Sequence, residues 1–124
     1  MSEDWFVRAI ERVAEAGRLA VQEIEQSVRE LEAGRHARLF GRPLAEVVEE
    51  LIGRGGPQIR SRTAQAFRDY ERAIAAMRAG VVRALVDEHG HTFTDVARKL
   101  GVSRQAVARL YHQADGVTGD AANK

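Results

Sequence analysis

The chain has 124 residues, and 44% of them are hydrophobic, which allows one compact domain or a small domain with an oligomerisation arm. It contains no cysteine, which excludes disulfide bonds and thiolate metal sites, and no run reaches the roughly twenty apolar residues of a membrane span. Two prolines only, with abundant Ala, Arg, Glu, Leu and Val, predict an all-α fold. The acidic N-terminus does not resemble a signal peptide, so we expect a cytoplasmic protein.

The net charge of +1 conceals an uneven distribution of charge along the chain. Residues 1–34 carry four arginines against eight acidic residues, whereas residues 91–124 carry five basic residues against three acidic ones. A protein that coats nucleic acid without specificity is usually far more basic. A local basic segment on a chain of otherwise balanced charge is instead typical of a regulator that must find one site on nucleic acid.

Residues 4–33 are predicted to form one long helix, capped at its start by Asp4 or Ser2. Its apolar stripe repeats every seven residues. The three lines of the stripe are Ile10, Gly17, Ile24 and Leu31; Phe6, Val13, Ala20 and Ser27; and Val7, Ala14, Val21 and Val28. Small residues in the stripe let another helix approach closely. The stripe either covers the protein's own core or pairs with the same helix of a second subunit, and both interpretations stay open.

Glycines and prolines divide the middle of the chain. Gly34 is predicted to end the first helix, and a short helix then runs from Pro43 to about Ile52. The glycine-rich stretch 53–57 stops that helix. Because it lacks the lysine and Ser/Thr of a phosphate-binding loop, it predicts no nucleotide site.

A second long helix is predicted from about Gln58 to Glu88, with a bend or a split at Gly80. We assign residues 1–79 to a helical dimerisation and scaffold region. The part of the helix after Gly80 would be the first helix of a C-terminal three-helix unit, residues 80–113. Residues 114–124 are short, polar and glycine-containing, and we expect a flexible tail there.

The most informative stretch is Phe93 to His112, FTDVARKLGVSRQAVARLYH. Its apolar and small residues fall where two short helices need them to meet across a tight turn: Val96, Ala97, Leu100, Gly101, Val102, Val107 and Leu110. Four of them would share a small core beneath the turn: Val96, Leu100, Val107 and Leu110. Thr92 with Asp95 can cap the first helix, and Ser103 can cap the second. The pattern resembles the helix-turn-helix DNA-binding unit of many bacterial repressors, site-specific recombinases and sigma factors.

The resemblance implies which residues contact DNA, because the second helix of such a unit lies in the major groove. The candidates are Thr92, Thr94, Ser103, Arg104, Gln105, Ala108, Arg109 and His112, with Lys99 and Tyr111 as further candidates for phosphate contacts. Arg104 can bind guanine O6 and N7, and Gln105 can bind adenine N6 and N7. Ala108 is small enough to let the helix lie deep in the groove.

We therefore predict a sequence-specific DNA-binding transcription regulator that binds double-stranded DNA as a homodimer through its N-terminal helix. Specific binding generally needs two such units about 34 Å apart. Two alternatives stay open: a sigma-factor-like or partner-binding interaction module, and a low-specificity nucleoid-associated protein. His89 and His91 have no third metal ligand nearby, and no serine lies in a nucleophile-elbow context, so we predict neither an enzyme nor a metal or cofactor site.

Overall fold

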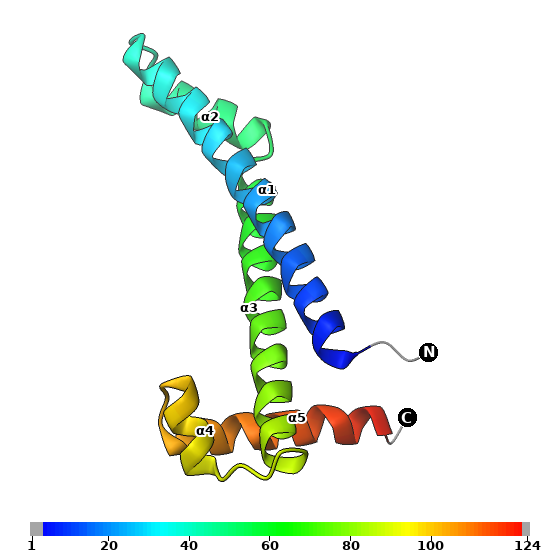
Figure 1. Cartoon of the computed structure of the whole chain (residues 1–124). Coiled ribbons are helices and arrows are strands. Elements are labelled where there is room, and N and C mark those ends of the chain that lie inside the picture. The colour runs from blue at the N-terminus through cyan, green and yellow to red at the C-terminus, as the bar shows by residue number, and fades with distance from the viewer. Residues whose placement is uncertain (1–3, 123–124) are drawn as a thin grey trace. The chain divides into compact units, whose positions relative to one another are not determined.

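A computed structural model describes the backbone of residues 4–122 and the side chains of residues 4–113. Over this range the chain is all-α, as the sequence predicts, with five helices and no strand (Figure 1). The helices are α1 (Trp5–Leu39), α2 (Leu44–Gly53), α3 (Gly56–Asp87), α4 (Phe93–Leu100) and α5 (Arg104–Ala122). None of these helices, within the part of the chain described, is long and apolar enough to cross a membrane.

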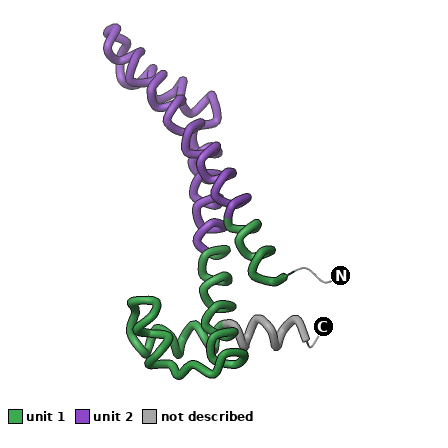
Figure 2. Tube along the Cα trace, in the orientation of Figure 1, with its two compact units in different colours: residues 1–13, 72–124 green, residues 14–71 purple. Residues whose placement is uncertain are grey.

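The chain divides into two compact units (Figure 2). One unit contains residues 14–71, and the other contains residues 1–13 together with 72–124. The sequence-based division at residues 79 and 80 separates regions by expected function rather than by packing. The backbone of α5 stays helical to Ala122, inside the segment 114–124 that we expected to be a tail. Side chains beyond residue 113, and all of residues 123 and 124, lie outside the described part.

α1 starts as predicted but extends past its predicted end. The Asp4 carboxylate accepts hydrogen bonds from the backbone N–H groups of Phe6 and Val7 at 2.7 and 3.2 Å, which is a helix cap; Ser2 lies outside the described residues. The prediction that Gly34 ends the helix is wrong. Gly34 is a packing position, where an added Cβ would lie 2.9 Å from a methyl carbon of Leu51 in α2.

In the unit formed by residues 14–71, α1 packs against α3 through small and polar side chains. Among the buried and half-buried positions of α1, one line alternates spacings of four and three residues: Ala16, Ala20, Glu23, Ser27, Glu30 and Gly34. The hydroxyl oxygens of Ser27 and Thr63 are 2.8 Å apart, and the Tyr70 ring lies 3.3 Å from where a Cβ of Gly17 would be. The small residues of α1 are therefore approached by helices of the same chain, Gly17 and Ser27 by α3 and Gly34 by α2.

α3 runs unbroken through Gly80, where the sequence suggested a bend or a split. The glycine instead makes room for an aromatic ring, because a Cβ at residue 80 would lie only 2.7 Å from the ring of Trp5. Trp5 is half-buried at the start of α1, and its ring meets Phe6 edge-on at 5.6 Å. Gly80 thus allows the first turn of α1 to approach α3 closely.

We expect Gly80→Ala to destabilise the protein, although alanine is favoured over glycine in a helix by about 1 kcal/mol. The new methyl group must displace the Trp5 ring, so the midpoint of urea unfolding should fall. Gly53→Ala is the matched control, since nothing lies within 4 Å of its added Cβ, and it should be neutral or stabilising. With Trp5→Ala already present, Gly80→Ala should become stabilising. A stabilising effect in the parent protein would contradict this interpretation of Gly80.

Candidate nucleic-acid interface

The end of α3 packs with α4 and α5 around a small core. Its buried residues are Val82, Val96, Ala97 and Val107, surrounded by the half-buried Leu85, Val86, Phe93, Leu110 and Tyr111. The predicted core positions Val96, Val107 and Leu110 are confirmed. The prediction for Leu100 is wrong, because its side chain is 42% exposed. Leu100 is the last residue of α4 and lies outside the cluster around Val82.

The predicted contacts at the turn between α4 and α5 are present. Thr92 and Asp95 form a capping box, in which the Thr92 hydroxyl accepts from the Asp95 N–H at 3.1 Å and the Asp95 carboxylate accepts from the Thr92 N–H at 3.3 Å. Gly101 ends α4 in the left-handed conformation, with φ of 70°. The Ser103 hydroxyl accepts from the Ala106 N–H at 3.0 Å. These contacts set where α5 begins relative to α4.

The capping box makes stability depend on pH. Hydrogen bonds from the backbone and side chain of Thr92 hold the pKa of the Asp95 carboxyl below its ordinary value. A carboxylate whose pKa is lower in the folded state stabilises the fold above its unfolded pKa of about 3.9, and this contribution is lost as the pH falls through the folded pKa. We expect Asp95→Asn to reduce the loss of thermal stability on acidification below about pH 4. An unchanged melting profile against pH would contradict that role.

The structure places the predicted DNA-contacting side chains on the outside of α4 and α5. The exposed residues are Thr92, Thr94, Ser103, Arg104, Gln105, Arg109 and His112, and Ala108 is half-buried. Lys99, at the end of α4, is exposed as well. The start of α5 therefore presents two guanidinium groups and one side-chain amide to solvent, while Val107 on the same helix is fully buried.

Aromatic contacts fasten α5 to α3 and lie beside one of these guanidinium groups. The Arg104 guanidinium carbon lies 5.7 Å from the centre of the Phe93 ring, which is itself 5.3 Å from the Tyr111 ring. The Tyr111 hydroxyl donates to Asp87 at 2.9 Å, and the Arg83 guanidinium lies over the Tyr111 ring at 4.4 Å. Tyr111, expected to contact phosphate, is thus engaged within the domain. Sequence reasoning missed this contact because Asp87 and Tyr111 are 24 positions apart.

The loop between α3 and α4 is held by His91. Its backbone N–H donates to the Leu85 carbonyl oxygen at 3.0 Å, and its Nδ1 lies 3.2 Å from the same oxygen. The ring of His89 is 6.4 Å away. No group of three potential metal ligands gathers among the residues that the structure describes. The contacts of His91 with the Leu85 carbonyl oxygen attach this loop to the end of α3.

Three helices around a valine-rich core, with a glycine turn before an exposed basic helix, define a helix-turn-helix domain. Residues 75–119 match the family model of the homeodomain-like domain, so the C-terminal part of the chain is a homeodomain-like helix-turn-helix domain. The resemblance found in the sequence is confirmed. The match does not extend over residues 1–74 or 120–124. No curated protein and no solved structure matches the chain.

Proposed function

We propose that the protein is a sequence-specific transcription regulator that binds DNA in the cytoplasm as a homodimer, with α5 of each copy in the major groove. The observation that carries this proposal is the exposed group of Arg104, Gln105 and Arg109 at the start of α5, in a homeodomain-like domain. Forked guanidinium groups and side-chain amides are the groups that distinguish base pairs by their major-groove edges. An apolar or acidic face there would instead favour a protein partner.

The exposed residues of α5 would contact different bases in the major groove. Arg104 would donate two hydrogen bonds to guanine O6 and N7, and Gln105 would pair with adenine N6 and N7. Arg109, further along α5, would reach a base or a phosphate. The short side chain of Ala108 would let the helix backbone lie close to the base edges. His112 extends this face beyond the first turns of α5.

Hydroxyl groups near the two helix starts would contact the phosphates. Thr92 and Thr94 lie at the start of α4, and Ser103 lies directly before α5. The N-terminus of a helix carries a partial positive charge and offers N–H groups, so anions bind there favourably. Such contacts position the domain on the duplex without reading its sequence.

A homodimer joined through α1 would supply the second recognition helix. One helix-turn-helix domain makes few phosphate contacts, whereas two copies can read two half-sites about 34 Å apart. The exposed apolar residues of α1 support association through this helix.

Fluorescence anisotropy with short duplexes at several salt concentrations tests the proposal. For a specific regulator we expect a preferred duplex to bind at least about 1,000-fold more tightly than random DNA at physiological salt. Equal affinity for all duplexes with a steep salt dependence would indicate a nucleoid-associated protein instead. No binding to any duplex at moderate salt would favour a protein-interaction module.

A further inference from the structure

α1 has a second apolar face, which nothing in the described part of the chain covers. Val21, Ile24, Val28 and Leu31 are 54%, 40%, 50% and 55% exposed, respectively. Their spacing of three, four and three residues places Val21 and Val28 at the first position of a heptad, and Ile24 and Leu31 at the fourth. The large apolar side chains of this helix thus face solvent, while its small and polar ones face α3. We call these four residues the outer stripe.

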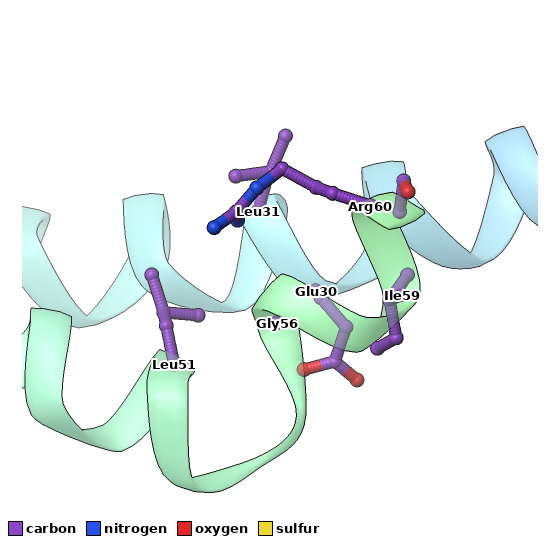
Figure 3. A pocket seen from close by; sticks show the side chains of 7 residues that line it. Glu30, Leu31, Leu51, Gly56, Ile59 and Arg60 are labelled. Carbon is purple, nitrogen blue, oxygen red and sulfur yellow. The ribbon is translucent and has the colours of Figure 1, made fainter. Parts of the chain in front are cut away.

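The outer stripe is bordered by one face of α3. Arg60, Ala64, Phe67 and Glu71 share that face, because their spacing alternates between four and three residues, and Phe67 is 48% exposed. Arg60 lies beside the stripe, since it lines the same cleft as Leu31 (Figure 3). The apolar surface therefore continues from α1 towards Phe67.

α2 widens the same surface. Leu51 of α2 lines the cleft together with Leu31 and Ile59 (Figure 3). Its neighbours Val48 and Ile52 are 43% and 56% exposed. Monomeric proteins rarely expose a continuous apolar patch of more than about 300–600 Å² without a function for it. Exposed apolar residues therefore occur on all three helices of this unit, as they do at sites of protein association.

We propose that the partner is a second copy of this chain, and that the outer stripes of the two copies pack together with their α1 helices parallel. This inference rests on the proposed homodimer and states which surface forms it. The stripe lies next to the seam with α3 and shares no residue with it, so the helical hairpin of residues 14–71 stays intact in each copy.

The composition of the outer stripe favours a second copy over other occupants. Val28 at the first heptad position with Leu31 at the fourth matches the pattern of two-stranded parallel coiled coils, in which β-branched residues alternate with leucine, whereas Ile24 at the fourth position departs from that pattern. A membrane surface or an unrelated flat protein face does not require a repeat of 3.5 residues. The repeat indicates another helix with the same spacing, and α1 of a second copy has it by definition.

Two pairs of charges around the stripe can meet between copies. Arg18, Glu25 and Glu32 are exposed on the side of α1 opposite the α3 border, where Arg18 also pairs with Glu15 at 2.9 Å and Glu32 with Arg35 at 3.4 Å in the same chain. The contact of Gly17 with Tyr70, and the cleft that Leu31 and Arg60 both line, show which residues of α1 and α3 lie at the same height. In a parallel pair, Arg18 then faces the partner's Glu71, and Glu32 faces the partner's Arg60. Such rim pairs set orientation more than affinity.

Sedimentation velocity of the full chain, without DNA, tests the surface. Leu31→Glu places a charge in the proposed interface, and we expect the dimer dissociation constant to rise about 100-fold or more. Leu19→Glu is the matched control, because Leu19 is 49% exposed but lies on the opposite side of α1; it should remain dimeric. Circular dichroism shows whether both variants keep their helices. A Leu31→Glu protein that dimerises as tightly as the parent would overturn the proposal.

Disulfide cross-linking tests the orientation, because the chain has no cysteine of its own. Val21→Cys and Val28→Cys, made separately, should each form disulfide-linked dimers on mild oxidation, since the first heptad positions of parallel helices meet each other. In an antiparallel pair only a residue at the centre meets its own copy, so the two variants cannot both cross-link. Cross-linking of one variant or neither contradicts the parallel arrangement.

The outcomes separate this inference from the proposed function. A chain that stays monomeric and fails to cross-link, yet prefers one duplex in anisotropy, would refute the interface and leave DNA recognition standing. A chain that dimerises through the stripe but binds no duplex would refute DNA recognition and leave the interface standing.

Discussion

Arg104→Ala and Gln105→Ala should each lower the affinity for the preferred DNA site about 5- to 150-fold, the equivalent of about 1–3 kcal/mol for a lost bidentate base contact. Binding to random DNA should change little, because phosphate contacts supply most of the non-specific affinity. The physical reason is that each substitution removes two directed hydrogen bonds and leaves the domain folded, since both side chains are exposed. Anisotropy titrations on the preferred and the random duplex measure both effects.

The matched control for Arg104→Ala is Arg68→Ala. Arg68 is an exposed arginine on α3 that donates to Gln65 at 2.9 Å, outside the homeodomain-like match. Its loss changes the net charge by the same amount and should leave the preference between duplexes intact. If Arg104→Ala weakened binding equally on every sequence, its guanidinium would contact phosphate rather than a base.

Val107→Ala should strongly destabilise the DNA-binding domain, by about 2 kcal/mol. Val107 is fully buried, and only Val82 and Val96 match it in the core of that domain, as far as the described residues show. Removing two methyl groups there leaves a cavity that the rigid contacts of α3 and α4 cannot close. Thermal unfolding followed by circular dichroism measures the loss.

Val102→Ala provides the control for Val107→Ala, because the same atoms are removed from a side chain that is 40% exposed. We expect it to cost well under half as much, since less apolar surface returns to water and no enclosed cavity forms. Equal destabilisation by the two substitutions would contradict the core as described.

Local features of the fold were predictable from the sequence because each depends on neighbouring residues. The capping box of Thr92 and Asp95, the cap at Ser103 and the left-handed Gly101 involve contacts within a few positions. Residue type and spacing alone predict such contacts. They also locate α4 and α5, and hence the exposed side chains that we propose as base contacts.

Long-range packing was not predictable in the same way. Gly34 and Gly80 looked like a helix end and a bend, because glycine is unfavourable inside helices. Each is instead needed for the approach of a distant side chain, Leu51 or Trp5. The engagement of Tyr111 within the domain likewise depends on Asp87. One sequence cannot identify these partners, since many apolar residues would satisfy the same spacing.

The two faces of α1 show a related limit of prediction from the sequence. The heptad pattern contains both the small residues of the seam and the large residues of the outer stripe. The sequence therefore left open whether the helix pairs within the chain or with a second copy. The structure assigns the small residues to α3, because Ala20 is buried and Ser27 contacts Thr63. The large residues of the outer stripe remain exposed, and we propose that they pack against a second copy of the chain.

Selection of bound fragments from a random duplex pool tests the central claim most directly. The account predicts enrichment of one motif that contains guanine and adenine contacts for Arg104 and Gln105. It also predicts that the motif occurs as an inverted repeat, with half-sites about 34 Å apart or a multiple of that distance. A pool that shows no enrichment after repeated rounds, while the protein remains folded, would contradict the account.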